Sequence, residues 1–468
     1  MKARALFVGG TSSNAGKSWM VTAICAWLRR RGVAVAPFKA QNMSNNSYPC
    51  RGGGEIGRAQ VVQAEACGLE PEPAMNPILL KPDGAGASQV MVDGRMWKTL
   101  PARAYYEHAA ELRSHVLAAY ADLSRRFDVV VIEGAGSVCE LNLRAVDLVN
   151  LGFVTTIRAP WLLVADIERG GVFASVIGTI GLLSADERSL LRGFAINKFR
   201  GDPALFEDGV TILEARTATR CLGVFPYMPD TVIDAEDTLA ASFEPHGDAP
   251  DGARIAIVRF PSIANVTDFR QWPWAEWIVA PTATAYDVVV LPGSKNTLGD
   301  LAWMRERGLD RWMLAQHARG AKIVGVCGGF QMLGRSIADP HRIESTRERA
   351  DGLGLLPIDT TLAPEKTTAV RKAMTRGGVR FDAYEIHVGE TTVDADVASF
   401  ATLDDGRADG ACVGRVFGTY LHGAFEDPAV CAEVLGVPAA RPQPKRQEYD
   451  RLADWFAEHV RHVDALGL

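Results

Sequence analysis

The sequence lacks any apolar run close to the roughly 20 residues that a membrane-spanning helix needs. It also lacks an excess of basic residues, since 50 lysines and arginines face 56 aspartates and glutamates for a formal net charge of -6. This charge predicts no global attraction to nucleic acid or to an anionic membrane. The eight cysteines include no C-x-x-C pair, so neither a disulfide framework nor a zinc site is expected. Because only four apolar residues separate the basic N-terminus from a glycine-rich stretch, no signal peptide is predicted, and we expect a cytoplasmic protein that acts on small molecules.

Apolar runs alternate with longer helical patterns along the 468 residues, and this alternation predicts two α/β domains with parallel sheets. Buried strands are expected in the first half at 5–10, 33–40, 128–136, 160–167 and 193–199, and in the second half at 254–260, 286–294 and 322–329. A stretch rich in proline, glycine and aspartate, residues 244–252, separates the two series. The predicted organisation is a first domain of residues 1–235, a linker of residues 236–252 and a second domain of residues 253–468. An apolar helical stripe from Tyr449 to Val463 is assigned to core packing.

Residues 9–18, GGTSSNAGKS, nearly match the phosphate-binding loop G-x-x-x-x-G-K-S and lie between an expected strand and an expected helix. Five residues rather than four separate Gly10 from Gly16, so the loop is longer by one. Backbone N–H groups and a helix N-terminus still point at the phosphates in such a loop. Lys17 is expected at the β- and γ-phosphates of ATP and Ser18 at Mg²⁺. The predicted ATP-binding residues are Gly10, Thr11, Asn14, Gly16, Lys17, Ser18 and Asn197.

Other expected strands of the first half also end in polar residues, at the edge where open α/β sheets bind ligands. Lys39, Gln41 and Asn42 follow one strand, and Glu133 ends another. Glu133 is a candidate magnesium ligand or a carboxylate that orients water, because Mg²⁺ prefers oxygen donors beside phosphates. A helix-capping or solvated acid is the alternative. Asn197, which is followed by lysine, is a candidate for contact with the nucleotide base.

The second half contains Gly325-Val326-Cys327-Gly328-Gly329 between an expected strand and an expected helix. This pattern is a G-x-C-x-G form of the nucleophile elbow, and the helix N-terminus favours the thiolate. Cys327 is therefore the candidate nucleophile, with a buried inert cysteine as the alternative. Its base is predicted to be His422, which follows an apolar segment and precedes glycine, and His387 is the competitor.

Several segments resemble known families. The loop GGTSSNAGKS is similar to that of dethiobiotin synthetase, and PFKAQNMSNNSY, EIGRAQ, NPILLKP, IEGAGSVCELNLR, DIERGGVFAS and INKFRGD resemble the synthetase half of the adenosylcobyric acid synthase family. In the second half, LPGSKNT, GVCGGFQMLG, YEIHVG and GTYLHG resemble the class I glutamine amidotransferase domain, a flavodoxin-like α/β fold. The chain is thus similar to that family along nearly its whole length.

The resemblance implies ATP-dependent amidation of corrinoid carboxylates in cobalamin biosynthesis, through an acyl phosphate and with ammonia released from glutamine. It names adenosylcobyrinic acid a,c-diamide as the acceptor, amidated at its b, d, e and g carboxylates. The resemblance also implies which residues interact with the charged groups: Lys17, Ser18, Lys39 and Glu133. Among these, Ser18 and Glu133 are expected to bind Mg²⁺. The substrate or its acyl phosphate is expected to contact Lys39, Gln41 and Asn42.

In the second domain the resemblance implies that Cys327 attacks the amide of glutamine and that His422 transfers the proton. Backbone N–H groups near Gly293 and Gly328 are the expected oxyanion hole. Class I domains usually carry a glutamate two residues beyond the histidine, but here that position is Ala424. Glu426 is a candidate substitute, and a Cys-His dyad is the simpler interpretation.

Alternatives remain open at this point. Cobyrinic acid a,c-diamide synthase has the same two-part chemistry, although we would expect it to lack the KAQNMSNN segment. A partitioning-type ATPase shares the unusual loop but has no use for Cys327 and His422. Residues that contact the corrin are expected between Asn76 and Arg95. The aromatic cluster of Trp272, Trp274 and Trp277 is expected to pack in the core rather than face a ligand. The sequence indicates no oligomeric state.

Overall fold

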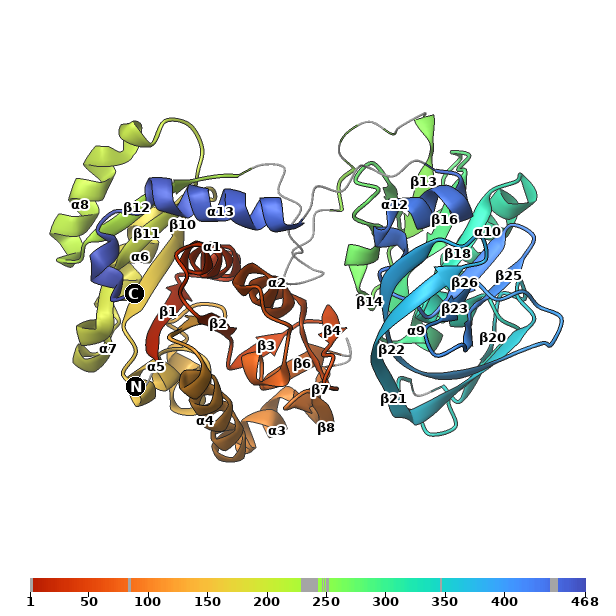
Figure 1. Ribbon diagram of the computed structural model, residues 1–468, viewed down its shortest axis with the longest axis horizontal. Helices are drawn as coiled ribbons and strands as arrows, with labels where there is room; N and C mark the ends of the chain where they lie inside the picture. The colour runs from red at the N-terminus through yellow and green to blue at the C-terminus, as the bar shows by residue number, and fades with distance from the viewer. Residues whose placement is uncertain are drawn as a thin grey trace.

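A computed structural model of the chain describes residues 3–82, 86–228, 252–345, 347–437 and 445–468, together with 243–245, 247 and 249. It comprises two α/β bodies that lie side by side (Figure 1). Most of the predicted linker 236–252 lies outside the described residues. Within the described ranges, no helix is both long and apolar enough to cross a membrane.

The first body is built on a six-stranded sheet in the order β12-β11-β10-β1-β9-β2. The strands are β1 (Arg4–Gly10), β2 (Val35–Phe38), β9 (Val129–Glu133), β10 (Trp161–Asp166), β11 (Leu191–Phe199) and β12 (Cys221–Pro226). Every neighbouring pair is parallel, so the carboxyl ends of the strands share one edge of the sheet. The predicted α/β class with a parallel sheet is confirmed, and β12 is a strand that the sequence analysis missed.

Helices cover both faces of this sheet, because successive side chains of each strand point to opposite faces. Phe7 and Ile132 enter one core, whereas Leu6 and Val131 enter the other. The helices are α1 (Lys17–Arg30), α2 (Arg58–Cys67), α3 (Ala102–Glu107), α4 (Ala109–Arg126), α5 (Leu151–Ile157), α6 (Val172–Gly181), α7 (Ala185–Leu190) and α8 (Glu207–Thr217). The core that contains Phe7 receives side chains from α4 to α8, and α1 packs into the other.

Small sheets, which the sequence analysis did not predict, extend the first body toward the second. One has the order β3-β6-β7-β8, and β4 pairs with β5 in a hairpin. Their bounds are β3 (Gln41–Met43), β4 (Ser47–Pro49), β5 (Glu55–Gly57), β6 (Ile78–Pro82), β7 (Ala87–Val92) and β8 (Arg95–Pro101). β3, β4 and β5 are only three residues long, and the buried apolar residues of β6 (Ile78 to Leu80) and β7 (Val90 to Val92) were not recognised as strands from the sequence.

The second body contains a sheet in the order β15-β13-β16-β18-β26-β25, parallel except for β25. Its strands are β13 (Ile255–Val258), β15 (Glu276–Ile278), β16 (Val288–Leu291), β18 (Lys322–Val326), β25 (Ala411–Val413) and β26 (Val416–Thr419). Its helices are α9 (Thr297–Glu306), α10 (Leu309–Ala318), α11 (Gly328–Met332) and α12 (Pro428–Val430). The predicted strands at 254–260, 286–294 and 322–329 correspond to β13, β16 and β18.

A second sheet of this body is dominated by the antiparallel pair of β21 (Ile358–Thr375) and β22 (Arg380–Val393). The remaining strands are β19 (Ser336–Ala338), β20 (Arg349–Asp351), β23 (Ala401–Leu403) and β24 (Ala408–Asp409), with β14 (Ile263–Ala264) paired to β17 (Gly293–Ser294). Trp272 and Trp274 are buried in the core and Trp277 packs against it, as predicted. These tryptophans therefore offer no face to a large flat ligand.

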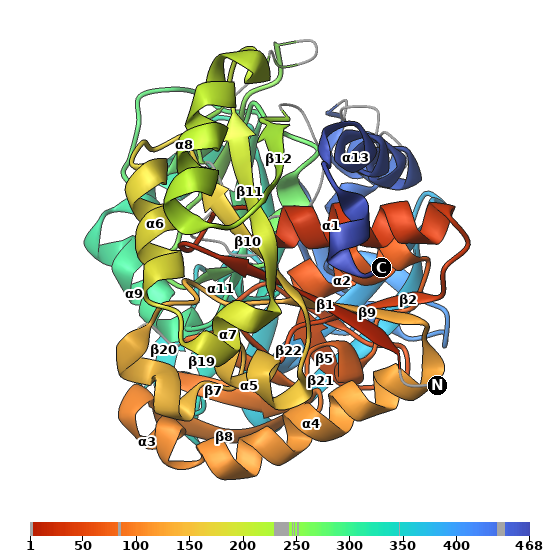
Figure 2. The same cartoon turned by 90° about the vertical axis from the view of Figure 1, so that its left-hand side faces the viewer.

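The last helix, α13 (Lys445–His459), packs on α1 of the first body (Figure 2). Leu452 and Phe456 enter the core that α1 also fills, and the Tyr449 hydroxyl donates to Glu65 at 2.5 Å. This differs from the predicted second domain of residues 253–468, which included the helix. The apolar stripe was correctly assigned to packing, but a stripe indicates a buried face without identifying what it packs against.

Candidate functional site

The long glycine-rich loop joins the carboxyl end of β1 to the N-terminus of α1. Gly16 precedes the helix with φ 96°, and a Cβ atom there would lie 2.0 Å from Nδ2 of Asn197. A Cβ at Gly10 would lie 3.0 Å from Cδ of Lys17, so the side chain of Lys17 passes directly over this glycine. Glycine is required at these positions by left-handed backbone in one case and by close approach in both.

Polar contacts hold the loop in shape. The Lys17 ammonium donates to the carbonyl oxygens of Ser12 at 3.0 Å and Gly136 at 2.9 Å. Asn197 is buried below the loop and its amide donates to the Ala15 carbonyl at 3.0 Å. Asn14 adopts a left-handed conformation with φ 61°. Asn197 thus supports the loop, and its contact with a nucleotide base stays a prediction.

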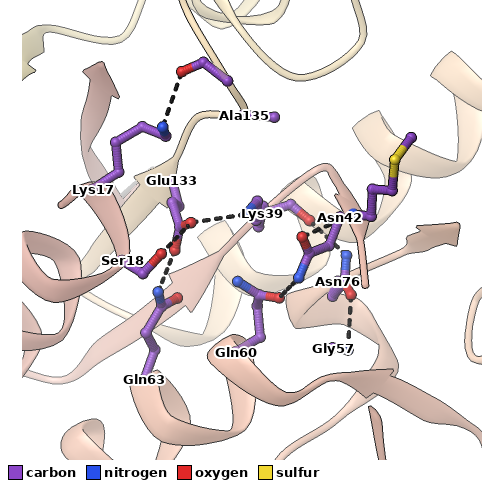
Figure 3. A network of polar contacts seen from close by, with 12 residues as sticks. Lys17, Ser18, Lys39, Asn42, Gly57, Gln60, Gln63, Asn76, Glu133 and Ala135 are labelled. Carbon is purple, nitrogen blue, oxygen red and sulfur yellow. Dashed lines mark hydrogen bonds and ion pairs between the residues drawn. The ribbon is translucent and has the colours of Figure 1, made fainter. Parts of the chain in front are cut away.

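Glu133 is the centre of a buried polar cluster at the end of β9 (Figure 3). Its Oε1 accepts from the Ser18 hydroxyl at 2.9 Å and from the Lys39 ammonium at 2.8 Å, while Oε2 accepts from the Gln63 amide. Glu133 and Lys39 are almost fully buried, so their ion pair compensates two charges that burial alone would make unfavourable. The alternative of a solvated acid is wrong.

The structure separates the three residues predicted at the substrate. Lys39 belongs to the Glu133 cluster, and Asn42 is buried and donates to Gln60 at 2.9 Å (Figure 3). Gln41 accepts a hydrogen bond from Tyr105 at 2.6 Å and lines a cavity of about 190 Å³. This cavity adjoins Gly136 of the loop that follows β9, so it lies next to the phosphate loop.

Cys327 lies between β18 and α11 in a strained turn, with φ 53° and ψ -111°. A Cβ at Gly329 would lie 1.9 Å from the Leu291 carbonyl oxygen, and a Cβ at Gly325 would lie 2.6 Å from that of Gly329. The backbone is therefore packed too tightly for any other residue on either side of the cysteine. This geometry is the nucleophile elbow that the sequence predicted.

Both glycines predicted for the oxyanion hole lie beside Cys327. Gly328 follows it, and a Cβ at Gly293 would lie 3.8 Å from Cβ of Cys327 and 3.3 Å from Cε1 of His422. The Cys327 thiol donates to the Ile386 carbonyl oxygen at 3.5 Å. The candidate nucleophile, the candidate base and both glycine positions thus lie close together.

His422 is buried and has partners on both ring nitrogens. Its Nδ1 donates to Oδ2 of Asp268 at 2.6 Å, and its Nε2 lies 3.3 Å from the side-chain amide of Asn265. Burial lowers the pKa of His422, but the charge of Asp268 and its hydrogen bond, with smaller contributions from Cys327, raise this pKa to about 10. Asp268 therefore favours the protonated form of the ring.

Asp268 is a candidate functional residue that the sequence analysis missed. It lies on a short 3₁₀ helix, η6 (Val266–Phe269), and its other carboxylate oxygen accepts from the backbone of Gly423 at 2.8 Å. The suggestion that Glu426 orients His422 is wrong, because Glu426 pairs with Arg58 and Arg270. Nothing around position 268 of the sequence signals this role.

His387, the competing base, occupies a different position. Its Nδ1 lies 3.0 Å from the Gly389 carbonyl oxygen, and its ring stacks on Tyr420 with centroids 3.8 Å apart. The Cys327 thiol contributes to the pKa shift of His422 through a hydrogen bond. The geometry therefore favours His422 over His387 as the partner of Cys327.

The first body contacts the loop that holds His422. Asn265 donates its backbone N–H to Oδ1 of Asn46 at 3.0 Å, and its own Oδ1 accepts from the Ser47 backbone at 3.3 Å. Asn46 belongs to the segment that also contains Lys39. The segment that follows Lys39 therefore contacts, through Asn46 and Asn265, the surroundings of the catalytic histidine candidate in the other body.

Comparison with known proteins agrees with this division. Residues 6–239 match the family model of the CobQ/CobB/MinD/ParA nucleotide binding domain, and residues 254–430 match that of the CobB/CobQ-like glutamine amidotransferase domain. The fold and these matches define a glutamine amidotransferase that carries its own nucleotide-binding domain. A cobyric acid synthase of Mycolicibacterium vanbaalenii is 46% identical over 477 residues, which cover 98% of this chain and 95% of the relative. The chain belongs to the cobyric acid synthase family, as its motifs predicted.

Solved structures show more distant likenesses. A glutamine amidotransferase from Thermotoga maritima is 12% identical with a TM-score of 0.25, over 36% of this chain and 75% of that one. The signal recognition particle receptor FtsY from Elizabethkingia anophelis, in complex with GDP, is 16% identical with a TM-score of 0.29. The match covers 48% of this chain and 58% of that one. At TM-scores this low neither likeness bears on the function.

Proposed function

We propose that the protein converts the b, d, e and g carboxylates of adenosylcobyrinic acid a,c-diamide to amides, using ATP and the ammonia of glutamine, in the cytoplasm. The observation that supports this most strongly is the pairing of two sites in one chain. A phosphate loop faces a buried Glu133–Lys39 pair in one body, and a cysteine elbow faces a buried histidine in the other. Activation of a carboxylate at the first site and release of ammonia at the second would together form an amide bond.

The first site is proposed to phosphorylate the carboxylate. Lys17 would neutralise charge on the β- and γ-phosphates of ATP, and the amides of the loop would hold their oxygens. The substrate carboxylate attacks the γ-phosphorus, the bond to the β-bridging oxygen breaks, and ADP leaves. Lys39 lies where it can stabilise the acyl phosphate, and Gln41 lines the adjoining cavity that we assign to the acceptor.

The same site suits a magnesium ion. Ser18 Oγ and Glu133 Oε1 lie 2.9 Å apart and are the hard oxygen donors that Mg²⁺ prefers. No group of three or more His, Cys, Asp or Glu side chains in the described residues could hold a metal ion, so phosphate oxygens would complete its coordination. The ion would supply positive charge to the transferring phosphoryl group.

The second site is proposed to release ammonia. The Cys327 thiolate attacks the amide carbon of glutamine, and backbone N–H groups at Gly293 and Gly328 stabilise the oxyanion. The C–N bond breaks as His422 gives its proton to the leaving nitrogen. Water then hydrolyses the thioester to glutamate, and the ammonia displaces phosphate from the acyl phosphate. The hydrogen bond between Asn46 and Asn265 brings the two bodies into contact next to His422.

Mass spectrometry of the corrinoid tests the whole proposal. Incubation with ATP, Mg²⁺ and glutamine is expected to replace OH by NH₂ on successive carboxylates of the a,c-diamide. Cobyrinic acid serves as the control acceptor, because a cobyrinic acid a,c-diamide synthase would amidate cobyrinic acid. Amidation of cobyrinic acid would therefore indicate that sister activity. No change of mass in the a,c-diamide would reject the proposed acceptor.

Asp268→Asn is expected to lower kcat/KM for glutamine hydrolysis by about 10²-fold or more, because the carboxylate orients His422 and keeps it charged. Without that charge, burial is opposed only by the smaller contributions of Cys327, so the pKa of His422 should fall from about 10. An NMR titration of the ring measures the shift directly. The ion pair also stabilises the folded protein fully below about pH 6.5, and this contribution is lost as the pH rises through about 10.

Glu426→Gln is the matched control, since Glu426 pairs with arginines at the boundary of the two bodies and does not contact His422. It is expected to leave the titration of His422 in place. An Asp268→Asn protein whose His422 still titrates near pH 10 would contradict the role given to Asp268.

A further inference from the structure

Two glutamines of α2 carry buried polar atoms that the mechanism above does not use. Gln60 and Gln63 lie three positions apart, so their side chains share one face of the helix, and both residues are fully buried. The Nε2 of Gln60 and the Oε1 of Gln63 have no hydrogen-bond partner within the described ranges of the chain. Because buried donors and acceptors are normally satisfied, these two atoms indicate a ligand that pairs with both.

The neighbours of the two amides fix which end of each has no partner. The Oδ1 of Asn42 accepts from the backbone N–H of Met43 at 2.8 Å, so its Nδ2 is the atom that donates to Oε1 of Gln60 at 2.9 Å. The Nε2 of Gln60 is therefore the end that faces away from Asn42. A carboxylate only accepts, so Glu133 takes the Nε2 of Gln63 as its donor and leaves the Oε1. The pair thus presents one donor and one acceptor.

Both glutamines lie beside the groups that are proposed to hold the acyl phosphate. Gln63 donates to Oε2 of Glu133, whereas Lys39 donates to Oε1 of the same carboxylate. In the view of Figure 3, Gln60 and Gln63 lie below the Glu133–Lys39 pair, and the Nε2 of Gln60 points toward Gln63. A group held at Lys39 is therefore close to the donor and the acceptor of the two amides.

The N-terminal end of α2 contacts the second body. Its first residue, Arg58, pairs with Glu426 of that body. The guanidinium of Arg58 also lies 5.9 Å from the ring centroid of Tyr384, and this ring stacks on His422. Gln60 lies only two positions further along the helix. The two glutamines therefore lie near the body that is proposed to supply ammonia.

We propose that Gln60 and Gln63 bind the two ends of the amide bond while it forms, an assignment that rests on the proposed function of the first site. The lone pair of ammonia attacks the acyl carbon, and the electron pair of the C=O bond moves to the oxygen. The Nε2 of Gln60 donates to this oxygen as negative charge develops on it, and the Oε1 of Gln63 accepts from an N–H of the ammonia. The C–O bond to phosphate then breaks, and phosphate leaves with one proton of the nitrogen.

The combination of a donor and an acceptor discriminates between the species of this reaction. A free carboxylate and an acyl phosphate offer only acceptor oxygens, so neither provides a donor for the Oε1 of Gln63. The tetrahedral intermediate and the carboxamide product carry both an acceptor oxygen and N–H groups. The two glutamines therefore bind the species that contain the new C–N bond better than the species that precede it, and this difference is what lowers the barrier.

Amidation with ammonium chloride tests the proposal, because it does not use the second site. Gln60→Met is expected to lower kcat for amide formation about 10²-fold with little change of KM for ammonium, since charge on the oxygen develops only in the transition state. Gln63→Met is expected to raise KM for ammonium about 10-fold, since one hydrogen bond to ammonia is lost. Both variants should form more ADP than amide, because water hydrolyses the acyl phosphate that ammonia does not capture.

Three measurements separate this role from a structural one. Glutamine hydrolysis at the second site should be normal in both variants and shows that the protein is folded. KM for ATP reports on Glu133, to which Gln63 also donates. Gln447→Met removes the same chemical group from an exposed position of α13 and should leave every constant unchanged.

The outcomes that contradict the proposal differ from those that contradict the proposed function. Amide and ADP in the same proportion as in the unmodified protein, in both variants, would overturn the assignment. A rise of KM for ATP alone in Gln63→Met would also overturn it, because Gln63 would then act only through Glu133. If the unmodified protein forms no amide from ammonium chloride and the proposed acceptor, the proposed function itself is rejected.

Discussion

Cys327→Ala should abolish amidation with glutamine and retain amidation with ammonium salts. Glutamine hydrolysis is expected to fall at least about 10³-fold, because the variant lacks the nucleophile on which the covalent step depends. The phosphate loop lies in the other body, so carboxylate activation by ATP should continue at its normal rate. Mass spectrometry measures the amount of amide formed with glutamine and the amount formed with ammonium salts, and the comparison of the two tests the prediction.

Cys412→Ala is the control for this experiment, since Cys412 is a half-buried thiol of the same body that lies on β25. It should hydrolyse glutamine like the unmodified protein. The Cys327→Ala variant must also keep its fold, which the ammonia-dependent activity reports. Substantial glutamine hydrolysis by Cys327→Ala would show that another group is the nucleophile and would remove the basis for His422 as its base.

The cysteine elbow could be predicted because all of its requirements are local. Gly325 and Gly329 allow the backbone to turn and approach β16, and each lies within two residues of Cys327. The phosphate loop is similar, since Gly10 and Gly16 are required by contacts within or beside the loop. Strands of the two parallel sheets were also predictable, because they are short runs of buried aliphatic residues between turns.

The partner of His422 could not be predicted, because it comes from a distant part of the chain. Asp268 lies 154 positions before His422 and reaches it only through the packing of η6 beside η7 (Ala424–Glu426). Glu426, four positions after the histidine, was the natural candidate by proximity. The pairing of its carboxylate with Arg58 and Arg270 turns it toward the other body. Proximity in the sequence therefore favoured Glu426 over Asp268 as the partner of His422, and the structure shows the opposite.

The assignment of α13 failed for a related reason. Its apolar stripe identified the buried face, yet the surface that receives it belongs to a helix more than 400 positions earlier, as the Arg30–Asp454 ion pair shows. The small sheets β3 to β8 were missed because three of their strands are only three residues long and because charged residues are buried among them. Lys81, for example, is buried on β6 and is stabilised there by Glu55, not by apolar neighbours. Long-range ion pairs of this kind leave no periodic pattern in the sequence.

Lys17→Met is expected to have the opposite effect to Cys327→Ala: it should lose amide formation and keep glutamine hydrolysis. Amide formation should fall at least about 10²-fold with either nitrogen source, because the positive charge on the transferring phosphoryl group is lost. Glutamine hydrolysis should persist, since Cys327 and His422 are untouched. The methionine side chain has a similar length, and the hydrogen bonds that it loses include those to the carbonyls of Ser12 and Gly136. Persistent glutamine hydrolysis would show that the fold is kept. Removal of Glu133 would be a poorer choice, because breaking its buried ion pair with Lys39 would cost about 3–5 kcal/mol of stability.

Lys372→Met, on the exposed side of β21, is the control and should leave both reactions unchanged. ADP release and glutamate release are measured in the same incubation, so that the two sites report separately. If the Lys17 variant forms amide at the normal rate, the long loop does not bind the transferring phosphate. If it loses glutamine hydrolysis as well, the two sites are coupled, and the contact of Asn46 with Asn265 is where that coupling would cross between the bodies. Asn46→Ala in the unmodified background would then reduce glutamine hydrolysis without affecting ammonia-dependent amidation.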